Sequence, residues 1–301
     1  MRVSLIDVDS KIPNLALMKL SAYHKKMGDV TGLSLSDPDR VYISVVFSEN
    51  VSQAMGIAKM FDCLVIVGGY YADVTLPSYI DHSMPDYGLY GIDYSMGFTT
   101  RGCIRNCSFC DVPRFEGMIH VSSDIYEFWN PDHSRIVLLD NNILAMPTHF
   151  EDIAFQLLYN NLIVDFNQGL DIRLVNDYNA QLLSCLRVQP QYRFAFDNPS
   201  IEDDVVRGIE ILKSHGINSC QWYVLVGFNT NHEQDLYRLN LLKELGQRVY
   251  VMRYRGQHYR CTSKWYNDLA AWGNQPRFFR SMDFEDFVRA RNKSRQLEVI
   301  E

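Results

Sequence analysis

Short apolar runs alternate with amphipathic stretches over most of this chain. Within the first ninety residues, runs of strand-like composition are separated by segments whose apolar positions follow a helical period. Strands that alternate with helices in this way form parallel sheets that helices cover on both faces. The pattern therefore predicts a small α/β domain over residues 1–90. Its strand-like runs are residues 3–8, 41–47 and 63–67.

Residues 91–256 repeat this alternation with longer helical segments. One of them, residues 200–215, has Ser200 as its expected N-cap, an acidic first turn, and Gly216 as its expected stop. Six strand–helix repeats predict a partial β/α barrel, in which ligands bind at the carboxyl ends of the strands. The six strand-like runs are residues 94–99, 135–139, 163–167, 192–197, 221–226 and 249–253.

The segment after the last strand is dense in aromatic and basic residues. Such a segment can pack as a helical cap, bind an anionic or planar substrate, or hold single-stranded nucleic acid by stacking and phosphate contact. For most of these residues we expect a helical cap. The predicted fold is thus α/β: a small Rossmann-like domain (1–90), a partial (β/α)6 barrel (91–256) and a C-terminal helical extension (257–301).

The composition is that of an ordinary globular protein, with 47% apolar and 22% charged residues. The net charge of −7 argues against broad, non-specific binding of nucleic acid. No apolar run reaches membrane-spanning length and no signal peptide is evident, so we expect a cytoplasmic protein without membrane contact. In a reducing compartment the seven cysteines are not expected to form disulfides.

Three of the cysteines lie close together, in a C-x3-C-x2-C pattern formed by Cys103, Cys107 and Cys110. Three thiolates on one loop can hold three irons of a 4Fe–4S cube, which leaves the fourth iron open to a small molecule. A Cys3His zinc site is the alternative, but the nearest downstream histidine, His120, is too far along the chain for the same knuckle. The other four cysteines are widely separated, and we expect them to be buried small residues; they are Cys63, Cys185, Cys220 and Cys261.

With Phe109 directly before its last cysteine, this motif resembles the cluster loop of the radical S-adenosylmethionine (radical SAM) superfamily. The resemblance implies that the open iron is chelated by the methionine moiety of SAM. It also implies that an electron from the cluster splits the sulfonium and yields a 5′-deoxyadenosyl radical. In this family the backbone around Phe109 lies near the adenine. The cluster then needs an external electron, so a flavodoxin or ferredoxin is an implied partner.

The N-terminal domain resembles the cobalamin-binding-type domain that precedes the radical core in several families. Those domains usually carry an Asp-x-His-x-x-Gly loop, whose histidine ligates cobalt. Residues 1–90 contain no such motif, and their only histidines are His24 and His82. We therefore expect the fold without the cobalamin. The barrel itself resembles that of methylthiotransferase-like and cobalamin-domain radical SAM proteins.

Polar residues follow several predicted strands and are candidates for binding SAM. Asp140, Asn141 and Asn142 supply acceptors for the SAM ammonium, although an ordinary Asx turn is an equally good interpretation. Gln168 and Arg173 follow the third strand, and a guanidinium suits the methionyl carboxylate or the substrate. An ion-pairing arginine is the alternative there.

Two further positions complete the predicted cofactor site. Asp197 ends the fourth strand and matches the acidic position of the family, where a carboxylate can accept both ribose hydroxyls. Gly227 begins a Gly-Phe turn after the fifth strand and permits close approach of the backbone to adenine. Arg253 and Arg255 alternate on the sixth strand, face one side, and are our candidates for contact with the substrate.

These residues predict a radical SAM enzyme that abstracts hydrogen from a small or medium-sized substrate. A radical SAM enzyme that processes RNA or a modified nucleobase is an alternative, weakened by the acidic charge. Nucleic acid is thus a possible but not favoured partner. A non-catalytic iron–sulfur regulator or scaffold is a third hypothesis, but it would not need the polar residues at the strand ends.

Overall fold

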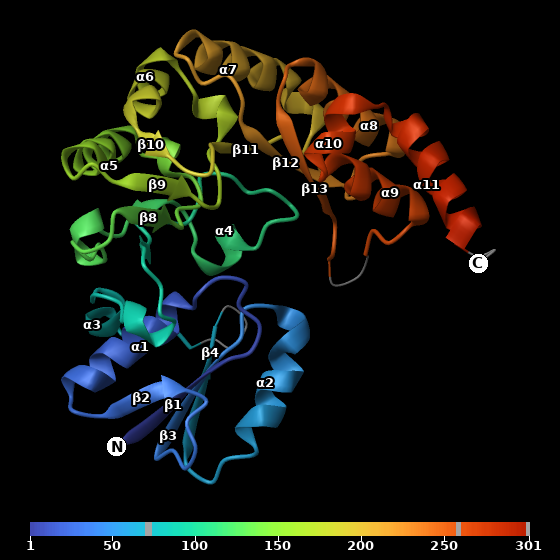
Figure 1. The fold of residues 1–301 in the computed structure, drawn as a ribbon. Coiled ribbons are helices and arrows are strands. Elements are labelled where there is room, and N and C mark those ends of the chain that lie inside the picture. The colour runs from blue at the N-terminus through green and yellow to red at the C-terminus, as the bar shows by residue number, and fades with distance from the viewer. Residues whose placement is uncertain (70–73, 257–259, 299–301) are drawn as a thin grey trace. The chain divides into compact units, whose positions relative to one another are not determined.

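The computed structural model describes residues 1–69, 74–256 and 260–298, the last five of these by backbone only (Figure 1). The chain divides into two compact units. One comprises residues 1–100, 121–139 and 161–164, and the other comprises residues 101–120, 140–160 and 165–301. The predicted α/β class is confirmed. The C-terminal extension was predicted to begin at residue 257, which lies outside the described residues; these resume at residue 260.

The N-terminal sheet is parallel, with the strand order β2-β1-β3-β4. Its two helices cover opposite faces (Figure 1). Val3 and Leu5 pack with Leu17 on one face, and Val41 and Ile43 pack around Ala54 on the other. The predicted runs form three of the strands; β2 is too exposed to give an apolar run. The elements are β1 (Arg2–Asp7), α1 (Leu15–Lys26), β2 (Val30–Leu33), β3 (Arg40–Ser44), α2 (Val51–Ala58) and β4 (Leu64–Gly68).

All six predicted barrel strands are present, in two sheets. The first sheet has the order β10-β9-β8-β5, and the second has the order β11-β12-β13. One parallel bridge between Leu170 and Phe194 links the segment after β9 to β11. The strands are β5 (Ser95–Gly97), β8 (Arg135–Leu138), β9 (Ile163–Phe166), β10 (Arg187–Val188), β11 (Arg193–Ala195), β12 (Gln221–Val226) and β13 (Arg248–Arg253).

Helices follow the strands as the periodicity predicts, but Ser200 is not the N-cap of its helix: it lies in the 3-10 turn 199–201, and the helix begins at Glu202. They are α5 (Pro147–Tyr159), α6 (Asp177–Cys185), α7 (Glu202–Ser214) and α8 (His232–Glu244). Shorter elements are α3 (Ser78–Asp81), α4 (Val112–Phe115), β6 (Thr100–Arg101), β7 (His120–Val121) and the 3-10 turns 48–50, 87–89, 125–127, 143–145, 172–174 and 199–201. None of the helices within the described parts of the chain is both long and apolar enough to cross a membrane.

The C-terminal extension is helical, as predicted, and packs beside β13 (Figure 1). Asn274, at the end of α9, exchanges hydrogen bonds with the backbone of Val251 at 2.5 and 3.2 Å. The buried Trp272 indole contacts Phe279 and Phe284 and joins the three helices. The extension comprises α9 (Lys264–Gly273), α10 (Pro276–Ser281) and α11 (Phe284–Glu298).

A fully buried ion pair ties the carboxyl ends of β11 and β12 together. Arg238 on α8 donates to Asp235 at 2.5 Å, and the side chains of both residues have no exposed surface. The same guanidinium donates to the carbonyl of Phe196 after β11 and to that of Leu225 on β12, the latter at 2.9 Å. Asp235 in turn accepts the N–H of Gly227 at 3.1 Å. The pair therefore satisfies backbone groups of both strands where ligands are expected to bind.

We expect Arg238→Met to lower the free energy of unfolding by about 3–5 kcal/mol, because it leaves the Asp235 carboxylate buried without its counter-charge. Urea denaturation followed by circular dichroism measures this. Arg289→Met is the matched control, because Arg289 and Asp286 form a pair of the same spacing on the surface. The free energy of unfolding of that variant should be close to that of the parent protein. Equal stability of the two variants would show that the buried pair is dispensable.

Candidate functional site

The cysteine motif forms a tight loop between β6 and α4. Gly102 opens it at φ +76°, where a Cβ would lie 2.6 Å from the carbonyl oxygens of Gly117 and Met118. Only glycine fits this approach. The Cys103 N–H donates to the Gly117 carbonyl at 3.2 Å, and the Cys110 N–H donates to the Cys107 carbonyl at 2.9 Å. The motif thus folds back on itself and brings its three thiols to one loop.

The sulfur of Cys103 is a hydrogen-bond acceptor from two sides. The Arg105 N–H approaches it at 3.3 Å, and Asn142 Nδ2 approaches it at 3.7 Å. Hydrogen bonds to the sulfurs are one means by which proteins set the potential of an iron–sulfur cluster. Cys103 and Cys107 are half-buried and Cys110 is exposed. The donor set fits an iron–sulfur cluster in its chemistry.

The charges around Cys107 come from several strand ends. Burial raises the pKa of its thiol above the usual value, while the Arg173 guanidinium opposes this rise. The acidic groups of Cys103, Asp197 and Asp171 add to it. Iron binding would supply the positive charge that favours the thiolate. This cysteine therefore lies within reach of the polar residues that follow β9 and β11.

Within residues 1–69, 74–256 and 260–298, no three histidine, cysteine or acidic side chains converge on one point suited to a single metal ion. A 4Fe–4S cube makes a different demand, because each thiolate binds a separate iron. The three thiols of the cysteine loop would therefore each reach a different iron and need not converge on one point.

Asp171, just after β9, is the centre of the polar network beside the loop. Its carboxylate accepts from Arg105 Nε at 2.8 Å, Arg173 Nε at 2.6 Å and Asn142 Nδ2 at 3.3 Å. Burial opposes ionisation of Asp171, but the hydrogen bonds from the two guanidinium groups outweigh it and lower the pKa of this carboxyl. Arg173, predicted to meet the SAM carboxylate, is thus engaged by Asp171. Arg105, which the sequence did not single out, joins the cysteine loop to the barrel.

The turn after β8 supplies further partners of the loop. Asn142 is 3% exposed, and its Oδ1 is buried without a hydrogen-bond partner in the described structure. Asn141 Nδ2 donates to Glu116 Oε2 at 2.8 Å, and the same oxygen accepts the Gly102 N–H at 2.9 Å. Glu116 was not predicted, because nothing in its neighbourhood marks it as a partner of Asn141. Asp140 is also buried.

Aromatic rings extend from the cysteine loop towards β13. Phe109 is 36% exposed and contacts Phe228 edge-on, with ring centroids 5.7 Å apart. Phe228 in turn contacts Tyr254, at 4.6 Å between centroids. Gly227 has φ +71°, and a Cβ there would meet Cys261 Sγ at 2.4 Å. The space that a side chain at position 227 would need is therefore occupied by Cys261.

Asp197 lies at the carboxyl end of β11 and accepts the Leu225 N–H at 2.8 Å. Burial raises the pKa of its carboxyl, although the Leu225 N–H and the charges of Arg238 and Arg173 act against the rise. Gln168 is exposed in the turn after β9. The structure thus brings Asp197 near the cysteine loop and leaves Gln168 on the surface.

Arg253 and Arg255 lie apart from this network. Arg253 shares a face of β13 with Val249 and Val251, which are buried, and it donates to Asn267 on α9. Arg255 is exposed. Their contact with a substrate stays a prediction.

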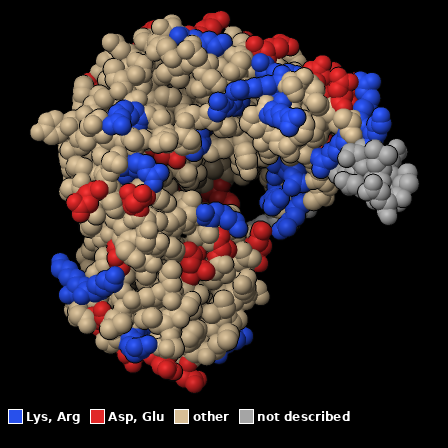
Figure 2. Space-filling model, viewed as in Figure 1, with Lys and Arg blue, Asp and Glu red and all other residues tan. Residues whose placement is uncertain are grey.

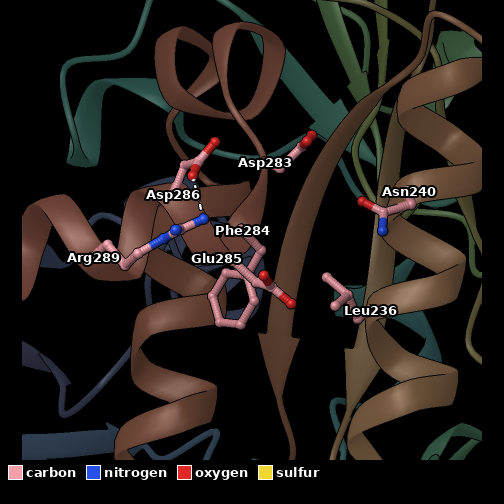
Figure 3. Close-up of a pocket in the computed structure, with 7 residues that line it drawn as sticks. All are labelled: Leu236, Asn240, Asp283, Phe284, Glu285, Asp286 and Arg289. Atoms are coloured by element: carbon pink, nitrogen blue, oxygen red, sulfur yellow. Dashed lines mark hydrogen bonds and ion pairs between the residues drawn. The ribbon is translucent and has the colours of Figure 1, made fainter.

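A cavity of about 260 Å³ lies between α8 and α11 (Figure 3). None of the cysteine-loop residues lines it. Asp286 pairs with Arg289 at 2.7 Å, and Asp283 pairs with Lys243 at 2.9 Å, so two of its acidic groups are engaged. The lining residues are Leu236, Asn240, Asp283, Phe284, Glu285, Asp286 and Arg289.

The fold has a counterpart among solved structures. No protein-family model matches the chain, and no curated protein matches it in sequence. A structurally similar protein is the radical S-adenosylmethionine methyltransferase TsrM from Kitasatospora setae, solved with cobalamin and a [4Fe-4S] cluster bound. The two share 11% sequence identity at a TM-score of 0.58, over 84% of this chain and 75% of TsrM. At this identity the likeness shows that the chain shares the fold of TsrM and no more.

We expect Asp171→Asn to loosen the cysteine loop, because it removes the charge that holds Arg105 and Arg173 together. Loss of a charged hydrogen-bond partner costs about 1.5–3 kcal/mol, so backbone amides of residues 103–110 should exchange at least about tenfold faster. Hydrogen exchange with mass spectrometry measures this. Asp204→Asn, which removes the exposed partner of Arg207, is the control. If the amides of residues 103–110 exchange at the parent rate in Asp171→Asn, the Asp171 carboxylate does not hold the loop in place.

Proposed function

We propose that this protein is a radical SAM enzyme that acts on a small or medium-sized substrate. The observation that carries the proposal is the cysteine loop, whose three thiols follow the first barrel strand. Within it, the sulfur of Cys103 accepts hydrogen bonds from Arg105 and Asn142. The radical SAM fold of the chain supports the same class.

The cofactors would supply the chemistry and the protein would arrange them. When bound, the 4Fe–4S cluster and SAM would together supply reductive hydrogen abstraction from the substrate, with one electron from a flavodoxin- or ferredoxin-type donor and with methionine and 5′-deoxyadenosine as products. Cys103, Cys107 and Cys110 would hold the cluster. Arg105, held by Asp171, would keep their loop in place.

Two polar groups are suited to hold SAM itself. The buried Oδ1 of Asn142 lacks a partner in the described structure and can accept an N–H of the SAM ammonium. The Asp197 carboxylate has one oxygen engaged by the Leu225 N–H, so its second oxygen is suited to a ribose hydroxyl. Arg173 is committed to Asp171, and we assign it to the loop support, with any contact to the SAM carboxylate secondary.

The overall charge favours a small-molecule substrate over nucleic acid. On the face drawn in Figure 2, Lys and Arg gather in the region of β13 and the C-terminal helices, whereas elsewhere basic and acidic groups are interspersed. A protein that tracks a nucleic-acid backbone presents a continuous basic stripe. With a net charge of −7, an RNA substrate would have to be recognised through a local site.

The histidines of the N-terminal unit support an enzyme without protein-ligated cobalamin. Both ring nitrogens of His24 have partners, Asp29 at 2.7 Å and Tyr42 at 3.1 Å. His82 Nδ1 pairs with Glu127 at 3.1 Å. His24 therefore has no ring nitrogen left to ligate cobalt, and His82, whose Nδ1 alone is engaged, is not part of an Asp-x-His-x-x-Gly motif.

Anaerobic reconstitution should give about four irons and four sulfides per chain, with one iron distinct from the others. With SAM and dithionite the protein should form 5′-deoxyadenosine, measured by liquid chromatography and mass spectrometry. Cys103→Ala, Cys107→Ala and Cys110→Ala should each abolish it, because each removes one iron ligand. Cys185→Ala, which alters an exposed cysteine on α6, is the control and should retain activity.

Two results would count against this proposal in different ways. One zinc per chain without iron–sulfur absorption would remove the cluster and the enzyme class together. A full cluster that never yields 5′-deoxyadenosine would leave the iron–sulfur regulator or scaffold as the better interpretation.

Cobalamin should be dispensable. Protein purified from cells supplied with cobalamin should carry far less than one cobalt per chain by elemental analysis, and formation of 5′-deoxyadenosine should not rise when cobalamin is added. The reason is that residues 1–90 contain no Asp-x-His-x-x-Gly motif and that both ring nitrogens of His24 are engaged. Stoichiometric cobalt that survives gel filtration would overturn this expectation.

A further inference from the structure

The two faces of β13 differ in what covers them. Val249 and Val251 are at most 5% exposed, and both lie against Gly273 of α9. The intervening residues Tyr250 and Met252 are 49% and 42% exposed. Side chains alternate along a strand, so the second face is the one turned away from the helices. In a β/α barrel that is the interior face.

The same face continues on β12 and towards the cysteine loop. Tyr223 is in register with Tyr250, and their rings meet edge-on at 6.0 Å. Leu225 is in register with Met252. Tyr254 is the next residue of this alternation, and it contacts Phe228, which contacts Phe109. We call these residues the aromatic track; they are Tyr223, Leu225, Tyr250, Met252, Tyr254, Phe228 and Phe109.

The side chains of the track itself are uncharged, and charged groups lie beside it or at its ends. Arg193 on β11 pairs with Asp165 on β9, and both side chains are largely buried, at 14% and 20% exposed. Arg248 is on the same face of β13 as Tyr250, at the amino end of the strand, and donates to Gln191 at 3.2 Å, whereas Arg253 is on the opposite face, against α9. A surface of rings and a thioether gains free energy by burying apolar rings, and none of its seven side chains carries a positive charge to offset the desolvation of an anion.

We propose that the aromatic track binds the substrate, and that this substrate is a planar ring compound without negative charge. Exposed apolar residues that lie together on a protein can mark a binding site, and three of the track, Phe109, Tyr250 and Met252, are exposed. The track ends at Phe109, next to Cys110. Tyr223 and Tyr250 would contact the ring edge-on or face-on, and Met252 would adapt to its outline. The substrate class rests on the proposed function, whereas the binding surface can be tested without catalysis.

The test uses the full reconstituted protein and three ligands of one skeleton. 2-Naphthol is planar and neutral, 2-naphthoate is planar and anionic, and decahydro-2-naphthol is neutral but not planar. Their dissociation constants are measured anaerobically by saturation-transfer NMR titration. We expect 2-naphthol to bind at least about fivefold more tightly than either of the other two, because it alone keeps the ring contacts without burying a charge.

The site is located with two matched tyrosine variants. Tyr250→Leu should weaken 2-naphthol binding at least about fivefold, through loss of the ring contact. Tyr237→Leu, on α8, removes a tyrosine of the same 49% exposure from a surface outside the track and should leave binding unchanged. Circular dichroism melting of both variants checks that they fold equally well.

The outcomes separate this inference from the proposed function. If 2-naphthoate binds best, or if Tyr250→Leu binds like the parent protein, the aromatic track is not the substrate site, even where 5′-deoxyadenosine is formed. If 2-naphthol binds through Tyr250 but no 5′-deoxyadenosine is formed with SAM and dithionite, the ring-binding surface stands and the radical SAM proposal falls.

Discussion

The buried pair between Asp235 and Arg238 holds together the edge of the barrel on which the candidate site depends. A buried pair is costly to desolvate and stabilises a fold only when its remaining donors and acceptors are satisfied. Here the guanidinium also bonds to the ends of β11 and β12 through its two terminal nitrogens, while its buried Nε has no partner in the described structure, and the carboxylate fixes the Gly227 turn. That turn places Phe228 against Phe109. The position of the rings beside the cysteine loop thus follows from one ion pair on α8.

Apolar periodicity was sufficient to predict the strands, because a parallel strand covered on both faces must be apolar along its length. All six barrel strands were found in this way. β2 was missed, since residues 30–33 are exposed or half-buried and leave no such run. The apolar pattern also cannot say how β9 meets β11. The contact there is a single bridge at Leu170, and a bridge of one residue leaves no periodic trace.

The candidate site, like the fold, could be predicted where the information is local in the sequence and not where it depends on distant residues. Cysteine spacing is local information, so the loop could be predicted, and the C-terminal ends of parallel strands identified Asp140, Asn142 and Asp197. The partners that hold these groups are separated by long stretches of chain. Asp171 meets Arg105 across 66 residues, and Asn141 meets Glu116 across 25. Neither pairing leaves a periodic pattern in the sequence, because each depends on which distant segments the fold brings together. Residue type left two interpretations of Arg173, a ligand for a carboxylate of SAM or of the substrate and an ion-pairing arginine, and the structure shows an ion pair with Asp171.

Strand alternation carries a consequence for substrate charge that residue types alone could not supply. Arg253 and Arg255 share a face, but the buried valines of β13 lie on that face as well, so Arg253 turns towards α9. A shift of one residue in register would exchange the two faces and put the arginines where the tyrosines now lie. The register with β12 fixes the actual choice, since Tyr223 opposes Tyr250 and Val226 opposes Arg253. Which side chains of β13 face the helices and which face away from them is therefore decided by the pairing of two strands.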